Sequence, residues 1–151
     1  MYHYTDSGLD YVYLQNGYEI HSTPYGEGIA IEDVEGLHEA ITRWVIDNPH
    51  KLRGAELRFL RKELDLTQAL LSGILGESRQ KILRWERDRD KDIPGSADRF
   101  LRAFVKECLD GNSSIADQVR RIAELDEKMM AERVNFCETD TGWTTDDCVA
   151  A

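Results

Sequence analysis

Residues 9–31 alternate apolar and polar side chains and contain turn signals, which together predict short strands. Tyr11–Leu14 is a β-prone run, and Asn16-Gly17 after it is a strong signal for a tight hairpin. Residues 18–21 and 29–31 are candidate return strands, separated by a turn rich in Pro and Gly. The pattern predicts a small antiparallel β meander. Such a meander needs a helix or a partner subunit to pack against, because so few strands bury little surface.

From residue 33 the apolar positions recur three and four residues apart, which predicts helices. Asp33 is the candidate cap of a first helix that ends before Pro49, and Thr67, Ser78 and Ser96 are candidate caps of later ones. Gly76 and Gly111 stand where helix ends favour glycine. The predicted buried positions of these five helices are Leu37, Ile41, Trp44 and Val45; Leu57, Leu60 and Leu64; Leu71, Ile74 and Leu75; Ile82 and Trp85; and Phe100, Leu101, Phe104 and Val105.

The region after residue 112 divides into a helix and a tail. Residues 114–134 predict an amphipathic helix that needs a partner surface, with the apolar positions Ile115, Val119, Ile122, Leu125 and Met129. Residues 136–151 are acidic and have few core residues, so we expect a loosely docked tail.

Three short patterns recur at fixed offsets between residues 57 and 86. Residues 57–68 contain Leu-Arg and Thr-Gln pairs, residues 75–78 read Leu-Gly-Glu-Ser, and residues 82–86 end in Trp-Glu. Together they resemble the Xre/Cro-type helix-turn-helix over roughly residues 54–106. The resemblance implies a mainly α fold with a small β N-terminal part. In that fold a five-helix-type helix-turn-helix domain follows the antiparallel β meander and precedes the amphipathic helix. The implied segments are residues 1–50, 51–111 and 112–151.

The resemblance also implies roles for individual side chains. Residues at four positions match the family's base-reading positions, and Arg and Gln there suit guanine and adenine edges: Arg79, Gln80, Lys81 and Arg84. Six others are implied to contact the DNA phosphates, either directly or through the helix start that they cap: Thr67, Gln68, Ser78, Arg58, Arg61 and Lys62. Ser72 and Asp88 depart from the family's usual Ala and Gly. The alternative is an exposed basic helix in an unrelated helical bundle.

A wider resemblance is to the MqsA-type antitoxin and regulator family. It covers residues 9–12, 26–27, 36–38, 54–62 and 98–102. Members of that family often bind zinc through two CxxC pairs in the N-terminal domain. Here Ser22 and Tyr25 stand at two of those Cys positions, so the resemblance implies the layout and no zinc site.

Charge is distributed unevenly, although the net charge is −10. Residues 51–106 contain 14 Lys/Arg and 9 Asp/Glu, whereas residues 1–50 contain 1 and 9, and residues 107–151 contain 4 and 11. DNA affinity depends on cations that neutralise phosphates, so only the basic middle is expected to meet DNA. Chance asymmetry in a charge-rich chain is the alternative interpretation.

Other functional classes find little support in the sequence. No apolar run approaches the length of a membrane helix and no signal peptide is evident, so we expect a cytoplasmic protein. The three cysteines, at 108, 137 and 148, are too widely spaced to predict a disulfide framework. No metal site, cofactor motif or catalytic constellation is predicted. Four N-terminal tyrosines are either a partner-binding surface or the core of a thin sheet: Tyr11, Tyr13, Tyr18 and Tyr25.

The sequence therefore predicts a sequence-specific DNA-binding transcriptional regulator, a repressor of its own gene that reads a palindromic site in double-stranded DNA as a homodimer. The dimer interface is expected in the N-terminal sheet, in the 114–134 helix, or in both. The alternative prediction is the antitoxin of a type II toxin–antitoxin pair, which binds and neutralises a toxin protein.

Overall fold

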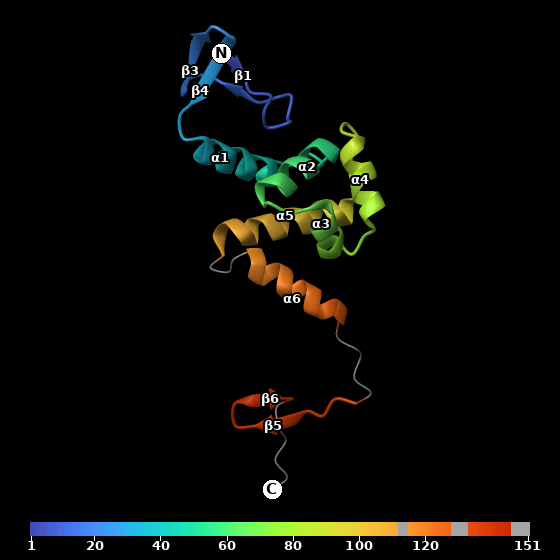
Figure 1. Ribbon diagram of the computed structural model, residues 1–151. Coiled ribbons are helices and arrows are strands. Elements are labelled where there is room, and N and C mark those ends of the chain that lie inside the picture. Colours follow the sequence, from blue (N-terminus) through green and yellow to red (C-terminus); the bar gives the residue numbers. More distant parts are fainter. Residues whose placement is uncertain (112–114, 128–132, 146–151) are drawn as a thin grey trace.

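The computed structural model describes residues 1–111, 115–127 and 133–145. These residues form six helices and three antiparallel pairs of short strands, so the chain is mainly helical (Figure 1). The helices are α1 (Val34–Asp47), α2 (Gly54–Glu63), α3 (Gln68–Leu75), α4 (Arg79–Arg87), α5 (Gly95–Asp110) and α6 (Ile115–Glu127). The strands are β1 (Tyr2–His3), β2 (Tyr13–Leu14), β3 (Tyr18–Thr23), β4 (Gly26–Ile31), β5 (Cys137–Thr139) and β6 (Gly142–Thr144).

The predicted meander is confirmed for its second and third strands, which pair as β3 and β4, and is wrong for its first strand. β2 pairs with β1, and β3 pairs with β4, but β2 and β3 are not paired. The β3–β4 hairpin turns between Thr23 and Gly26. Gly17, with a φ of 79°, ends the connection from β2, and its carbonyl accepts a hydrogen bond from the Glu32 amide at the base of that hairpin. The Asn-Gly prediction fails because β2 pairs with the first residues of the chain.

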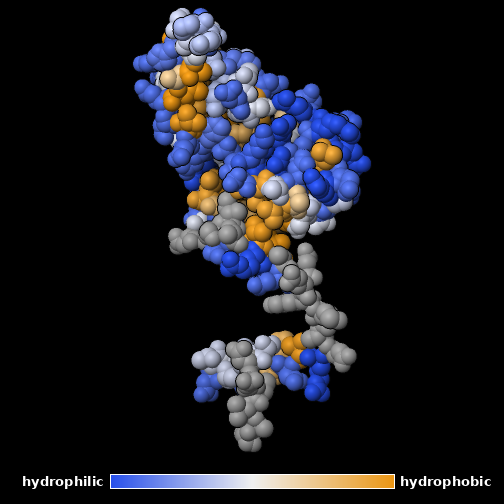
Figure 2. All heavy atoms as spheres, in the orientation of Figure 1, coloured by the Kyte–Doolittle hydropathy of each residue, from blue (hydrophilic) through white to orange (hydrophobic). Residues whose placement is uncertain are grey.

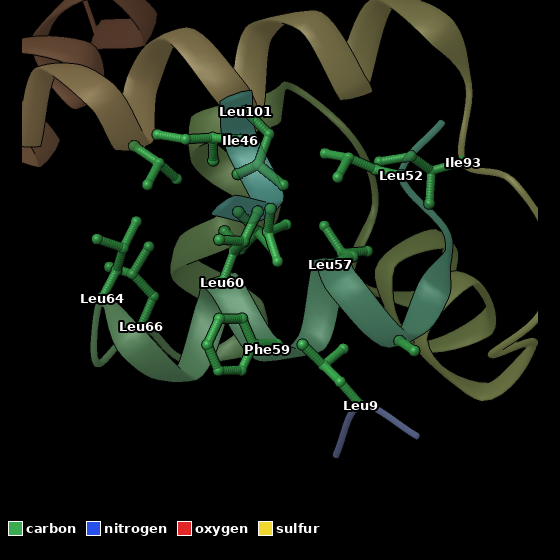
Figure 3. Close-up of a cluster of buried hydrophobic side chains, with 14 of the residues drawn as sticks. Leu9, Ile46, Leu52, Leu57, Phe59, Leu60, Leu64, Leu66, Ile93 and Leu101 are labelled. Carbon is green, nitrogen blue, oxygen red and sulfur yellow. The ribbon is translucent and has the colours of Figure 1, made fainter. Parts of the chain in front are cut away.

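One apolar core joins the N-terminal segment to the helices. Leu9 is 1% exposed and lies beside Leu57 and Phe59 of α2 (Figure 3), although it is distant from them in sequence. The same core continues through α1, α3, α4 and α5 as far as Val105. It therefore crosses the predicted segment boundary near residue 50.

A chain of polar contacts fixes the N-terminal segment to α1 and α2. The Tyr4 hydroxyl lies 2.6 Å from His38 Nε2, and His38 Nδ1 lies 2.5 Å from Glu63 Oε1. Tyr4 is buried, and burial raises the pKa of its hydroxyl, so the hydroxyl keeps its proton in this contact.

Arg102 of α5 holds the end of α1. Its guanidinium donates to the carbonyls of Val45, Ile46 and Asn48 at 2.7–3.2 Å and also contacts the carbonyl of His50. Asp98 aligns the guanidinium at 2.6 Å. Carbonyls at a helix C-terminus have no hydrogen-bond donor in their own helix, so the Arg102 guanidinium supplies the missing donors.

Several predicted positions are corrected. Trp44 and Phe100 are 48% and 43% exposed, because Ile46 and Leu101 occupy the buried positions of their helices. Ser96 does not cap α5, which begins after Pro94 without a side-chain cap. The predicted tail contains the β5–β6 hairpin. Cys137 is disulfide-bonded, which the wide spacing of the cysteines did not predict, whereas Cys108 is free.

The helix predicted over residues 114–134 is confirmed only over α6, Ile115–Glu127; residues 133 and 134 are not helical, and Met129 lies outside the described residues. Over the described ranges, no helix has both the length and the apolar character needed to cross a bilayer.

Candidate nucleic-acid interface

α3 and α4 are joined by a sharp turn whose geometry follows from three residues. Thr67 Oγ1 accepts a hydrogen bond from the Leu70 amide at 3.1 Å, and Ser78 Oγ accepts one from the Lys81 amide at 3.2 Å. Gly76 ends α3 with a φ of 68°, in the left-handed region that favours glycine. The predicted helix starts at residues 68 and 79 are confirmed, because each is specified by a local cap.

The inner face of α4 is held against α2 by apolar and ionic contacts. Ile82 is fully buried, and Trp85 packs half-buried against the core. Glu86 accepts two hydrogen bonds from Nε of Arg61 at 3.0 and 3.2 Å and one from its Nη2 at 2.7 Å. The Arg61 and Glu86 side chains are 14% and 5% exposed. This pair fixes the rotation of α4 about its own axis.

Two predicted phosphate contacts are directed into this internal network. The Arg61 guanidinium also donates to the Leu66 carbonyl at 3.0 Å, so each of its three nitrogens donates within the protein. Gln68 Nε2 lies 3.4 Å from Glu86 Oε2. We therefore remove Arg61 from the candidate interface, and Gln68 retains its place only through its backbone amide at the start of α3.

A second close contact fixes the far end of α4. A Cβ atom on Gly54 would lie 1.9 Å from the carbonyl oxygen of Trp85, so only glycine permits this approach of α2 to α4. The amide of Gly54 donates to the carbonyl of Lys91, and the amide of Ile93 donates to that of Leu52. The segment after α4 is thereby tied to the segment before α2.

The outer face of α4 carries the four predicted base-reading side chains: Arg79, Gln80, Lys81 and Arg84. All four are exposed and belong to one helix, which lies at the right-hand edge of Figure 1. Lys81 pairs with Glu77 at 3.0 Å. Within the described residues the other three side chains have no hydrogen-bond or ion-pair partner. Their donors are therefore available to a ligand.

The remaining predicted cations lie beside the N-terminal loop. Arg58 and Lys62 are exposed on α2 and line a cavity of about 250 Å³ together with Arg89 and residues 5–8. Arg89 was not predicted as a site residue, and its Nη2 donates to the Gly8 carbonyl at 2.5 Å. The charge run over residues 87–92 was the signal that pointed to it.

Asp88 ends α4 with a φ of −85°, so this position does not require the glycine that the resembled family often has there. In the described part of the chain no group of three or more His, Cys, Asp or Glu side chains is arranged to hold a metal ion.

No protein-family model matches the chain, and neither a curated protein nor a solved structure matches it. The function of this chain is therefore inferred from the geometry of α3, α4 and their surroundings.

Proposed function

We propose that this protein is a sequence-specific DNA-binding transcriptional regulator in which α3, the turn at Gly76 and α4 act as a helix-turn-helix. In this proposal α4 enters the major groove, which is wide enough for one helix. Arg79 and Arg84 donate to guanine edges and Gln80 to an adenine edge.

The observation that supports this proposal most is the contrast between the two faces of α4. Ile82 and Glu86 fix its inner face, whereas Arg79, Gln80 and Arg84 on its outer face are exposed and have no partner in the described residues. A helix that is rigidly held and presents free donors pays little ordering cost when it binds. This arrangement suits base reading better than it suits an ion-paired surface helix.

Phosphate contacts are proposed at the start of α3 and on α2. Exposed amides at a helix N-terminus, here following Thr67, favour an anion. Ser78 caps the N-terminus of α4 in the same way. Arg58 and Lys62, with Arg89, line one cavity and supply further positive charge for phosphate contacts.

We propose that the regulator acts as a homodimer on a palindromic site. Phe100, Phe104 and Ile122 line a cavity of about 650 Å³ between α5 and α6, and Figure 2 shows apolar surface where these helices lie. Sedimentation of the wild-type chain and of Phe100→Asp tests this. Phe100 is 43% exposed, so the variant retains its fold and is expected to sediment as a monomer.

The test of DNA binding is fluorescence anisotropy with DNA from upstream of the protein's own gene, measured across a salt series with scrambled competitor. We expect saturable binding that resists competitor and weakens as salt rises. The Arg79→Ala/Arg84→Ala double variant is expected to lose the preference for this DNA.

Arg120→Ala is the matched control, because it removes a cation from α6, where the side chain is 70% exposed. Absence of binding by the wild-type chain at low salt, or equal loss in the control, would contradict the proposal.

A second candidate function is neutralisation of a partner toxin, and the β3–β4 hairpin favours it. The hairpin extends from the helices at the top of Figure 1, and Tyr25 and Ile20 are 100% and 57% exposed. An exposed apolar hairpin is suited to contact another protein. Copurification of a small toxic protein with the wild-type chain, lost in Ile20→Ser/Tyr25→Ser, would favour this role. A monodisperse wild-type chain that binds DNA alone would oppose it as the main role.

A further inference from the structure

A cavity of about 460 Å³ lies apart from the outer face of α4. The N-terminal segment, the end of α1, the start of α2 and the segment after α4 all contribute to its wall. The lining residues are Tyr11, Trp44, His50, Lys51, Arg53, Glu56 and Asp92. None of the four predicted base-reading residues is among them.

Buried polar atoms without a partner are concentrated at this cavity. In the described ranges, four buried side-chain polar atoms have no hydrogen-bond partner, and three belong to lining residues: Tyr11 Oη, His50 Nε2 and Glu56 Oε2. Glu56 is 1% exposed. A buried polar atom without a partner destabilises the fold, so three of them on residues that line one cavity point to a ligand that would satisfy them once the cover over the cavity opens.

The chemistry of these atoms restricts the ligand to a hydrogen-bond donor. A carboxylate oxygen only accepts hydrogen bonds. His50 Nδ1 lies 3.3 Å from the Lys51 carbonyl, so a proton assigned to Nδ1 makes Nε2 an acceptor as well. The Tyr11 hydroxyl can either donate or accept.

The walls favour a flat molecule. The rings of Trp44 and His50 are stacked with centroids 5.2 Å apart, and the rings of Tyr11 and Trp44 are 5.5 Å apart. Trp44 is 48% exposed, so part of its indole remains open to a ligand. Aromatic faces of this kind stack on planar rings.

Charge favours a neutral ligand, because the carboxylates of Glu56 and Asp92 are balanced by Lys51 and Arg53 around the cavity. Arg53 covers the polar end of the cavity. Its Nε lies 3.1 Å from Glu56 Oε1, and its guanidinium carbon lies 5.9 Å from the centre of the Tyr11 ring. Asp90, 3.8 Å from Arg53 Nη1 and 88% exposed, offers an outward position for this side chain.

We propose that this cavity binds a small, uncharged, planar heterocycle with an amino group, which stacks on Trp44 and donates a hydrogen bond to Glu56 Oε2. Arg53 moves toward Asp90 to admit it. The site is separate from the proposed DNA-reading face, because no residue of the outer face of α4 lines it.

The test uses adenine and cytosine as probes and purine, which lacks the amino group, as the matched ligand. The full chain is titrated in NMR amide spectra at neutral pH. We expect saturable shifts centred on residues 11, 44, 50 and 56 with at least one amino-bearing probe. Purine is expected to bind about tenfold more weakly than adenine, because it lacks the donated hydrogen bond.

Two variants separate the site from general stacking. Trp44→Ala is expected to abolish saturation, and Tyr11→Phe removes only the hydroxyl and is expected to weaken binding about tenfold if the probe bonds to it. Trp143→Ala is the control, because that indole is 70% exposed in β6 and does not line the cavity. Failure of both amino-bearing probes to saturate would overturn the proposal. Equal binding of purine and adenine, or shifts confined to other residues, would overturn it too.

Discussion

Arg61 and Arg84 carry the same guanidinium on neighbouring helices, yet their surroundings are opposite. Arg61 is 14% exposed and makes three hydrogen bonds with Glu86. Arg84 is exposed and has no partner within the described residues. Arg61 of α2 bonds to the inner face of α4, whereas Arg84 lies on the outer face of α4.

This difference shows that burial, and not residue type, distinguishes an arginine that stabilises the fold from one that is a candidate for binding a ligand. A buried pair is strongly coupled because little water screens it, whereas an exposed cation contributes little to folding. Substitutions at the two positions should therefore affect different properties of the protein.

The largest effect is expected at the buried pair. Arg61→Ala leaves Glu86 as an uncompensated buried charge and is expected to lower the free energy of unfolding by about 3–5 kcal/mol. Urea denaturation monitored by circular dichroism measures this. Arg58→Ala, an exposed cation on the same helix, is the control and should change stability by less than about 0.5 kcal/mol. Similar losses in both variants would refute the division.

Gly54→Ala should have the next largest effect, because its Cβ would lie 1.9 Å from the Trp85 carbonyl oxygen and would force α2 and α4 apart. We expect a loss of about 2–3 kcal/mol of stability. Gly73→Ala on α3 is the matched control, since its Cβ meets no atom within 4 Å. That variant should gain about 0.5–1 kcal/mol from helix propensity. Thermal denaturation measures the Tm of both variants. A Tm of Gly54→Ala that is not below that of Gly73→Ala would contradict this assignment.

Arg84→Ala should leave stability unchanged and weaken specific DNA binding by about 1–3 kcal/mol, with one base preference relaxed. Anisotropy on a panel of single-base operator variants measures both. If affinity and preference match those of the wild-type chain, Arg84 is not a base reader and the proposed role of α4 is weakened.

Alkaline pH should reveal the buried tyrosines, in contrast to the exposed face of α4. Burial raises the pKa of Tyr11 from 10.0 to about 12, with the carboxylate of Glu56 adding to the shift. The unfolded chain therefore loses this proton before the folded chain does, so stability is complete below pH 10 and falls between pH 10 and 12. Tyr11→Phe should reduce the slope of the urea midpoint against pH over this range. Equal slopes would show that Tyr11 does not contribute.

The smallest effect is expected at Asp65, between α2 and α3. Its φ of 54° lies in the left-handed region, which glycine adopts without steric cost. Asp65→Gly should raise the free energy of unfolding by about 0.5 kcal/mol. Calorimetry measures the change in Tm, with Asp65→Val as the opposite control. A lower Tm in Asp65→Gly would contradict this account.

Capping residues explain why α3 and α4 were predicted closely. The hydroxyls of Thr67 and Ser78 each bond an amide three residues ahead, so the helix start is encoded within one turn of chain. Gly76 is equally local. These signals can be recognised in the sequence without knowledge of the rest of the fold.

The β3–β4 hairpin was predicted, but the pairing of β2 was not, because its partner β1 lies on the other side of the chain from the Asn-Gly turn signal. Asn16-Gly17 has the composition of a hairpin turn, but Tyr13 pairs with His3 and leaves β3 to pair with β4. A competing partner elsewhere in the chain decided the outcome, and a local turn signal carries no information about it.

The candidate site was predicted in part for the same reason. The exposed positions of α4 follow from helical periodicity around Ile82. The burial of Arg61 does not follow from helical periodicity. Its partner Glu86 lies 25 residues away, and the burial depends on how α2 packs against α4. The cavity beside Trp44 could not be predicted from the sequence, because Tyr11, Trp44 and Glu56 come from three separate segments.

The sequence by itself determined where α3 and α4 begin and which positions around Ile82 are buried or exposed, because capping and periodicity act within a few residues. The tertiary structure alone decided which strands pair, which arginine is buried and which polar atoms lack partners. Those outcomes depend on desolvation, which is set only when segments distant in the chain meet around one core.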